Sequence, residues 1–215
     1  MPRILITAGP TREYLDPVRY LSNASSGKMG AALAKAALNA GFEVTIVSGP
    51  VGCHYPQELR VIRVTTTDEM LQACLQVFPD CVGAIGAAAP CDFRPKAVSV
   101  EKIKKTGDDT MTVEFVATPD IFAELGKIKQ PNQWLVPFAL ETCENGKEHA
   151  LEKLRQKNGD WIILNGPKTI LGGYAEVEIL DRTGTTLATL SGTKESVATQ
   201  IIGTINAELR MQYAE

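Results

Sequence analysis

Short, almost uninterrupted apolar runs alternate with amphipathic segments along most of this 215-residue chain. The runs ILITAG (residues 4–9), EVTIVSG (43–49) and LVPFALE (135–141) are separated by stretches in which apolar residues recur with helical spacing. Continuous apolar strands joined by helices are typical of a parallel sheet that is covered on both faces. The sequence therefore predicts an α/β, Rossmann-like fold with a mostly parallel sheet and helices on both faces.

The remaining strands and helices are predicted from the same two patterns, continuous apolar runs for strands and helical spacing of apolar residues for helices. Further strands are predicted at residues 59–65, 83–90 and 160–165, and helices at residues 31–41, 67–78, 119–129, 145–159 and 193–209. Thr67 is the expected N-cap of the second helix, because threonine is a good N-cap and Glu69 follows closely.

Two segments break the alternation. Residues 96–117 carry the polar turn TGDD and predict a flap-like hairpin, whereas residues 175–191 predict a second hairpin around DRTG. Because no internal repeat or linker separates the elements, we expect a single domain of residues 1–215 from which the two hairpins protrude.

Composition excludes several classes of function. The net charge is −3, whereas a nucleic-acid-binding protein is expected to carry a clustered basic surface. Apolar runs stay too short for a membrane span, and the N-terminus lacks the regions of a signal peptide. The five cysteines show no C-x-x-C spacing, which indicates reduced thiols and neither a zinc site nor a disulfide framework. We expect a cytoplasmic protein without a nucleic-acid or membrane partner, and its metal ligands stay open.

The loop RYLSNASSGKMG (residues 19–30) lies between the first strand and the first helix. It lacks the G-x-G-x-x-G fingerprint of a dinucleotide site. Backbone N–H groups of the first helical turn, with the hydroxyls of Ser25 and Ser26 beside them, are suited to one phosphate. The alternative is that one of these serines merely caps the helix. Arg19 and Asn23 in the same loop favour the anion site.

Three other segments are candidate ligand-binding sites, and each of them also has an ordinary structural explanation. The small residues of GAAAPCDFRP (86–95) would admit a flat ring or a sugar, or would simply pack tightly at a strand end. In a strand, Lys102 and Lys104 would share one face, and Lys153 and Lys157 are i, i+4 neighbours on a helix. In both cases the alternative is a solvated charged face.

Taken together, these segments closely resemble phosphopantothenoylcysteine synthetase, a ligase of coenzyme A biosynthesis, in its bacterial form. The resemblance covers essentially the whole chain. Its motifs, in order, are ITAGPTREYLDPVRYLSNASSGKMG, VSGPV, AAAPCDFRP, EKIKK, TPDI, FALET and KNGDWIILN. In bacteria this enzyme is usually the C-terminal half of a bifunctional flavoprotein whose other half is phosphopantothenoylcysteine decarboxylase. The resemblance therefore implies a stand-alone synthetase without FMN, for which a separate decarboxylase is a conceivable partner.

The resemblance implies a reaction in two steps. The carboxylate of 4′-phosphopantothenate attacks the α-phosphorus of CTP, and pyrophosphate leaves. The amine of L-cysteine then attacks the acyl cytidylate, which yields phosphopantothenoylcysteine and CMP. Such transfers depend on positioning and on cations that stabilise oxygen charge, to which Mg²⁺ on the triphosphate would contribute.

The resemblance also implies roles for individual residues. Lys102 matches the catalytic lysine of the flap, Asn23 matches the asparagine that handles the acyl intermediate, and Arg19 belongs to the phosphopantothenate side. Ser25, Ser26 and Gly27 would receive a substrate phosphate. The positions implied to contact the nucleotide are Gly86, Ala87, Ala88, Ala89, Asp92, Lys102, Pro119, Asp120, Ile121, Phe122, Phe138, Lys153 and Lys157.

Two departures from the family pattern bear on these expectations. VPFALET stands where GPFALET is usual, and APCD stands where AVAD is usual. Because Pro90 lacks an N–H group, one contact to the base would be lost, and strict preference for CTP over ATP stays open.

A homodimer is expected as well. Members of the family pair, and the apolar residues of two protruding hairpins need a surface on which to be buried.

Two rival functions compete with a ligase. A nicotinamide-dependent reductase would share the alternating pattern, but the fingerprint is missing and none of the five tyrosines has a lysine four residues on. The second rival is a catalytically silent nucleotide-binding or flavoprotein accessory module, from which only turnover distinguishes a ligase.

Overall fold

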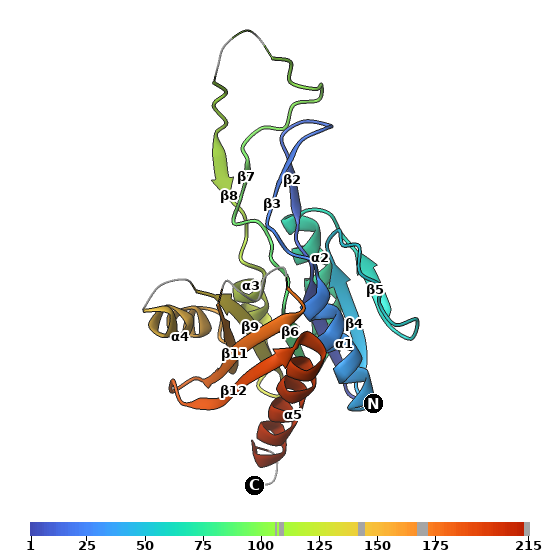
Figure 1. Cartoon of the computed structure of the whole chain (residues 1–215), viewed down its shortest axis with the longest axis vertical. Helices are drawn as coiled ribbons and strands as arrows, with labels where there is room; N and C mark the ends of the chain where they lie inside the picture. Colours follow the sequence, from blue (N-terminus) through green and yellow to red (C-terminus); the bar gives the residue numbers. More distant parts are fainter. Residues whose placement is uncertain (106, 108–109, 142–144, 167–171, 213–215) are drawn as a thin grey trace.

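A computed structural model describes residues 1–105, 107, 110–141, 145–166 and 172–212. Eight strands form one sheet in the order β12-β11-β10-β9-β6-β1-β4-β5 (Figure 1). In chain order these strands are β1 (Arg3–Ala8), β4 (Glu43–Ser48), β5 (Arg60–Arg63), β6 (Gly83–Gly86), β9 (Trp134–Leu140), β10 (Trp161–Asn165), β11 (Tyr174–Asp181) and β12 (Thr186–Thr193).

The predicted parallel sheet is confirmed for the six strands from β5 to β10, which pair parallel throughout. The chain moves outward from β1 through β4 to β5, and it then returns to β6 on the other side of β1. This reversal creates a switch point at the carboxyl ends of β1 and β6, which is where open α/β sheets bind ligands.

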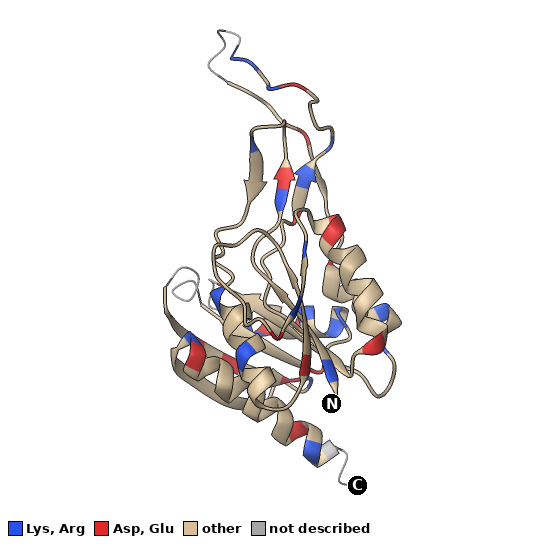
Figure 2. Ribbon diagram, turned by 90° about the vertical axis from the view of Figure 1, so that its right-hand side faces the viewer, with Lys and Arg blue, Asp and Glu red and all other residues tan. Residues whose placement is uncertain are grey.

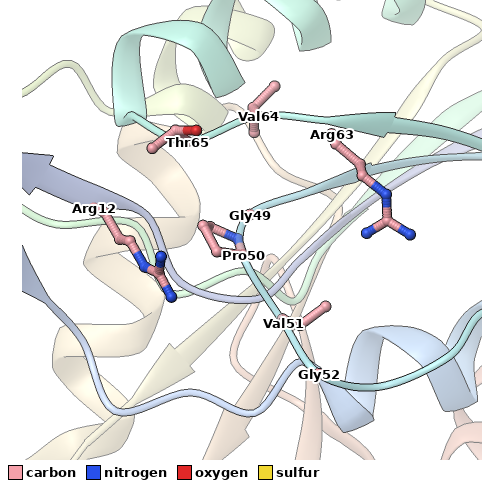
Figure 3. A pocket seen from close by; sticks show the side chains of 8 residues that line it. All are labelled: Arg12, Gly49, Pro50, Val51, Gly52, Arg63, Val64 and Thr65. Carbon is pink, nitrogen blue, oxygen red and sulfur yellow. The ribbon is translucent and has the colours of Figure 1, made fainter.

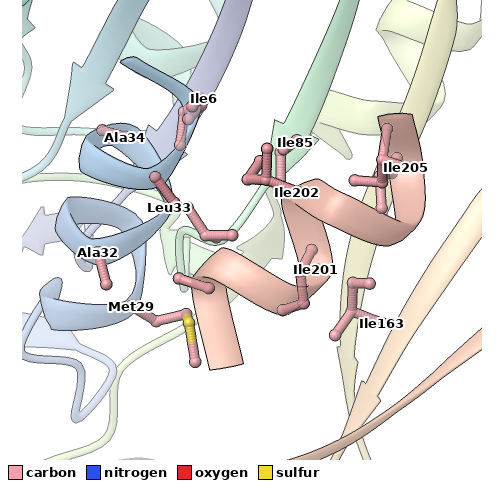
Figure 4. Close-up of a cluster of buried hydrophobic side chains, with 14 of the residues drawn as sticks. Ile6, Met29, Ala32, Leu33, Ala34, Ile85, Ile163, Ile201, Ile202 and Ile205 are labelled. Atoms are coloured by element: carbon pink, nitrogen blue, oxygen red, sulfur yellow. The ribbon is translucent and has the colours of Figure 1, made fainter. Parts of the chain in front are cut away.

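Helices cover both faces of the sheet, as the sequence predicts. They are α1 (Lys28–Asn39), α2 (Thr67–Val77), η1 (Phe78–Asp80), α3 (Ile121–Ile128), α4 (Gly146–Gln156) and α5 (Lys194–Gln212). Alternate residues of β1 serve the two faces: Ile4 and Ile6 pack in the core beneath α1 and α5, and Leu5 packs in the core beneath α2 and α3. Figure 4 shows α1 and α5 side by side over the first of these cores. None of the helices in the described part of the chain is long and apolar enough to cross a membrane.

The N-cap of α2 is Thr66, so the expectation of Thr67 is wrong by one residue. The Thr66 hydroxyl accepts from the N–H of Glu69 at 3.1 Å, and the Glu69 carboxylate accepts from the N–H of Thr66. This reciprocal pair satisfies two helix-end donors. Thr67 is fully buried, and its hydroxyl instead lies 2.9 Å from that of Thr11.

The second hairpin does not protrude, contrary to expectation. Strands β11 and β12 extend the main sheet, because β11 pairs antiparallel with β10. Val177, Ile179 and Leu190 are buried in the core beneath α5. These residues therefore need no partner chain to cover them.

The first hairpin protrudes from the carboxyl edge of the sheet, but it is a ribbon only at its base. Its paired strands are β7 (Phe93–Pro95) and β8 (Phe115–Ala117), and residues 96–105 between them form no strand. We call residues 93–117 the arm. Lys102 and Lys104 consequently do not share the face of a strand. Figure 2 shows basic and acidic positions interleaved along the arm.

A short hairpin that the sequence did not predict stands beside the arm. Strands β2 (Arg12–Tyr14) and β3 (Tyr20–Ser22) pair antiparallel within the loop that follows β1. Strand β2 lies against β7, so the two ribbons leave the same end of the sheet together (Figure 1).

Candidate functional site

A cleft of about 710 Å³ opens at the carboxyl edge of the sheet, at the switch point of the topology. The ends of β6, β9 and β10 form its floor together with the first residues of α1, α3 and α5. Residues of both the loop 19–30 and the segment GAAAPCDFRP, which the sequence marked as candidates, line this cleft.

The N-terminus of α1 opens into this cleft without a side-chain cap. Gly27 is the N-cap residue, with a left-handed φ of 73°, and no side chain caps the helix. A Cβ on Gly27 would lie 2.6 Å from the side chain of Val51. Ser25 and Ser26 line the cleft beside it. The alternative that one of these serines caps α1 is wrong, and the helix end stays available to an anion.

Asn23 ties this loop to the end of β6. Its side-chain amide donates to the carbonyl oxygens of Pro90 at 2.8 Å and Ala89 at 3.3 Å. The two segments that the sequence singled out, SNASSGKMG and GAAAPCDFRP, thus meet at one wall of the cleft.

The backbone amides of residues 87–89 are already engaged within the protein. The N–H of Ala87 donates to the carbonyl of Thr7, that of Ala88 to the Thr7 hydroxyl, and that of Ala89 to the carbonyl of Gly9. A ligand at this wall meets small side chains and carbonyl oxygens, so recognition of a base here relies on acceptors and on shape.

Every position that the resemblance assigns to the nucleotide lines the cleft, with the exception of Lys102. Phe122 is 6% exposed, and its ring would lie 2.6 Å from a Cβ on Gly86. It therefore supports the wall from beneath. Phe138 is half-buried at the end of β9.

Lys153 in α4 and Lys157, the C-cap residue of that helix, line the cleft, but both are paired with carboxylates. The ammonium group of Lys153 lies 2.6 Å from Glu141, and that of Lys157 lies 2.9 Å from Asp120. Asp120 also caps α3 by accepting from the N–H of Ala123. Burial favours its neutral form, but the charge of Lys157 and the N–H donors outweigh burial and lower the pKa of Asp120.

Lys102 and Arg19 lie outside the residues that line the cleft. Lys102 is exposed on the arm. Arg19 donates to the carboxylate of Asp16 at 2.8 Å and to the carbonyl of Ile103 at 2.9 Å. Asp16 is completely buried and also accepts from the N–H of Ile103 at 3.1 Å. In this chain Arg19 and Asp16 fasten the arm to the β2–β3 turn.

Sequence reasoning missed several residues of the cleft, among them Thr7, Lys28, Asn165 and Lys194. The Oδ1 atom of Asn165 is buried and accepts no hydrogen bond from the described residues, so a ligand donor can satisfy it. Lys194 is 3% exposed. Only its place at the end of a hairpin could have signalled it, because it directly follows the last strand.

The carboxylates of the cleft suit magnesium that arrives with a nucleotide. The described residues contain no group of three or more potential protein ligands for a metal. Asp92 and Asp120 line the cleft. Mg²⁺ bound to a nucleotide usually takes only one or two carboxylates, and phosphates and water supply the rest.

A second, smaller pocket of about 470 Å³ lies behind the turn that follows β4. Figure 3 shows Arg12 and Arg63 on opposite sides of the Gly49–Gly52 segment. The guanidinium of Arg12 stacks 4.5 Å above the ring of Tyr20. Val51 separates this pocket from Gly27 and hence from the cleft.

Comparison with known proteins decides the family. The family described as "DNA/pantothenate metabolism flavoprotein C-terminal domain" matches residues 2–209. The chain belongs to this family. The matched range includes the sheet, the residues that line the cleft and the arm.

Two curated relatives share this domain. A protein named "Cysteine/Cysteine sulfinic acid decarboxylase", from an unknown prokaryotic organism, is 44% identical over 205 residues, which cover 93% of this chain and 56% of the relative. The "Coenzyme A biosynthesis bifunctional protein CoaBC" of Borreliella burgdorferi is 39% identical over 180 residues, which cover 84% of this chain and 46% of the relative. The chain thus spans about half the length of the curated relatives it matches.

Solved structures support the fold. The crystal structure of the C-terminal domain of CoaBC is 38% identical, with a TM-score of 0.82 and coverage of 97% of this chain and 96% of that domain. A Cab2 mutant in complex with phosphopantothenate-cysteine is 20% identical, with a TM-score of 0.81 and coverage of 99% of this chain and 88% of that one. At that identity the Cab2 likeness concerns the fold alone.

Proposed function

We propose that this chain is a phosphopantothenate–cysteine ligase, which joins 4′-phosphopantothenate and L-cysteine in coenzyme A biosynthesis. One observation carries the proposal: a single cleft collects every nucleotide position implied by the sequence except Lys102. The 38% identity to the C-terminal domain of CoaBC, over almost all of both chains, supports it.

The nucleotide would lie along the floor of the cleft. Its base and ribose would meet the small residues at the end of β6, and its phosphates would meet the open N-terminus of α1 beside Ser25 and Ser26. Mg²⁺ on the triphosphate would reduce the negative charge that the reacting carboxylate approaches.

In the first half-reaction, a carboxylate oxygen of phosphopantothenate forms a bond to the α-phosphorus of CTP. The bond from that phosphorus to the bridging oxygen breaks, and its electron pair leaves with pyrophosphate. Lys102 would meet the developing oxygen charge once the arm closes over the cleft, and closure would exclude water from the hydrolysable intermediate.

In the second half-reaction, the amine of cysteine attacks the acyl carbon, CMP leaves and the amine loses a proton. Asn23 stands at the wall where the acyl group would lie. Its amide would orient that group while it is held by the carbonyls of Ala89 and Pro90.

Preference for CTP over ATP is a finer part of the proposal. Because the amides of residues 87–89 are engaged, the base would be selected by acceptors and by shape. The exocyclic amines of cytosine and adenine can both donate to such acceptors, so preference for CTP would depend on a site that fits the smaller ring. Equal or better rates with ATP would contradict this preference and leave the ligase intact.

A homodimer and a single domain are further proposals. Val98, Val100 and Met111 on the arm are 57%, 93% and 57% exposed, and such apolar side chains are suited to a second copy of the chain. The continuous eight-stranded sheet supports one domain over residues 1–215. Light scattering at micromolar concentration tests the dimer, and a monomeric mass would contradict it.

One assay tests the ligase directly. The protein is incubated with phosphopantothenate, CTP, Mg²⁺ and cysteine, and the products are separated by chromatography. We expect CMP, pyrophosphate and phosphopantothenoylcysteine in equal amounts. CDP with free phosphate would contradict the mechanism, and absence of turnover would favour a silent nucleotide-binding module. Addition of a separate phosphopantothenoylcysteine decarboxylase would show whether the two enzymes associate.

A further inference from the structure

Two lysines begin the two helices that share one face of the sheet. Lys28 is the first residue of α1, and Lys194 is the first residue of α5. Strand β12 runs antiparallel to β11, which itself runs antiparallel to β10, so β12 points the same way as the parallel strands. Helix α5 follows β12 directly, and it therefore begins at the same carboxyl edge as α1. Both lysines line the cleft.

This placement is unfavourable for the protein by itself. A cation at a helix N-terminus meets the positive end of the helix dipole, where carboxylates are normally preferred. The first turn of α1 contains no acidic residue at all. Lys194 is 3% exposed. Its burial and the like charge of Lys28 lower the pKa of Lys194, and the neighbouring Glu195 offsets this only in part.

The other cationic end of the cleft is already neutralised. The ammonium groups of Lys153 and Lys157 each contact a carboxylate, at 2.6 Å and 2.9 Å. Lys28, by contrast, forms no ion pair with a carboxylate of the described residues. Lys28 thus adds a charge that no described carboxylate neutralises, close to Lys194 and to the hydroxyls of Ser25 and Ser26.

We propose that Lys28 and Lys194 together bind the β- and γ-phosphates of the nucleoside triphosphate and hold the pyrophosphate that leaves. This inference rests on the proposed ligase function and adds the residues that receive the leaving group. Pyrophosphate carries the most negative charge in the reaction, so it is the ligand that best relieves repulsion between two lysines and two helix dipoles. As the bond from the α-phosphorus to the bridging oxygen breaks, the electron pair stays on an oxygen that these lysines face.

The test uses binding as well as turnover. Affinities of the full chain for magnesium pyrophosphate, for CTP and for CMP are measured by calorimetry in wild type and in Lys194→Met. We expect the affinity for pyrophosphate and for CTP to fall about tenfold or more, the usual effect of losing a charged hydrogen bond, while the affinity for CMP is retained. The matched control is Lys35→Met, because Lys35 is exposed on α1 outside the cleft.

A second variant distinguishes a loss of binding from misfolding. Lys28 is exposed, so Lys28→Met should fold normally and still lose affinity for pyrophosphate. Unchanged pyrophosphate affinity in both variants would overturn the inference, as would an equal loss for CMP and pyrophosphate, which indicates a structural role. A wild-type protein that binds pyrophosphate through these lysines and yet makes no phosphopantothenoylcysteine would contradict only the ligase proposal.

Discussion

The floor of the cleft is supported by buried packing, whereas the arm is held mainly by hydrogen bonds. The floor consists of strand ends and helix starts whose neighbours are buried, such as Ala8 and Leu33 at 0% exposure. Among its described residues, the arm pairs as strands over three residues at its base. Further out, Lys96 bonds to Glu114, Ser99 bonds to Leu15, and Ile103 bonds to Asp16 and Arg19. A well-packed floor can position a nucleotide in advance, whereas a sparsely held arm can open and close. Substitutions that disturb the packing of the floor should therefore affect stability, and substitutions of side chains that line the cleft should affect binding or the chemical step they serve. Substitutions in the arm should affect rate alone.

The largest expected effect concerns Asn23 at the wall of the cleft. In Asn23→Asp an ionised carboxylate would face the carbonyls of Ala89 and Pro90 and could donate to neither the protein nor the acyl group. We expect conversion of the acyl cytidylate to fall by about 100- to 1,000-fold, the usual effect of one oxyanion donor. Single-turnover trapping with cysteine measures this, with exposed Asn39→Asp as the control. A variant that forms no intermediate would place Asn23 earlier in the reaction.

The next largest effect concerns Lys102 on the arm. Lys102→Gln keeps most of the side chain and removes its charge, so formation of the cytidylate should slow by about 100-fold or more. Because the residue is exposed, the melting temperature should not change. Lys104→Gln is the matched control and should act more weakly. A rate for Lys102→Gln within about threefold of wild type would return this lysine to the solvated surface.

A glycine in α1 tests how tightly the floor is packed. A Cβ on Gly30 would lie 2.4 Å from that of Ala8, so Gly30→Ala must push the helix away from β1. Overpacking of this kind typically costs about 1–3 kcal/mol of unfolding free energy. Gly203 in α5 has nothing within 4 Å of its Cβ position. Gly203→Ala should instead stabilise the protein by up to about 1 kcal/mol. Denaturant unfolding measures both, and equal effects would contradict a tightly packed floor.

A smaller effect is expected where the arm is fastened. Asp16→Asn keeps the side chain's shape but weakens its bonds to Arg19 and to the N–H of Ile103. We expect faster hydrogen exchange at the Ile103 amide and about a tenfold slower activation step, while nucleotide affinity stays unchanged. Asp181→Asn is the control, because Asp181 lies in a remote turn with similar bonds. Loss of nucleotide affinity in Asp16→Asn would show that arm and floor are not independent.

The smallest expected effect is a pH dependence of the hydrogen bonds that hold the arm. Burial alone would raise the pKa of Asp16, but three backbone N–H donors and Arg19 outweigh it and lower this pKa below 3.8. A carboxylate with a lowered pKa stabilises the folded state above its unfolded pKa and loses that contribution as the pH falls through the folded value. Protection of the Ile103 amide should therefore persist at neutral pH and disappear below about pH 4. Loss of this protection near pH 6 would implicate another group.

The core could be predicted because it follows from local patterns. The run ILITAG alternates its side chains between two cores, and β-branched and aliphatic residues fill both. The loop before α1 was singled out because Arg19 and Asn23 accompany its serines, although serines at a strand–helix junction are also common N-caps. The N-cap at Thr66 was a local signal assigned one residue too late, because Thr66 and Glu69 form a capping box. The place of the second hairpin depends on pairing with β10 and could not be predicted locally, and the β2–β3 hairpin was missed.

The alternation of apolar runs with helical spacing was enough to predict the parallel core, because this period is present in every short segment of the chain. The family resemblance, and not this period, supplied most of the named residues that line the cleft. Only the tertiary structure decided that β11 and β12 extend the sheet and that α5 therefore begins at the cleft. The direction of a strand depends on its partner, and that pairing brings Lys194 beside Lys28 although 166 positions, 194 minus 28, separate them in the chain. The same dependence on distant contacts places Arg19 against the arm and outside the cleft, because its guanidinium bonds to Asp16 and to Ile103. Lys102, which precedes Ile103 on the arm, also lies outside the cleft.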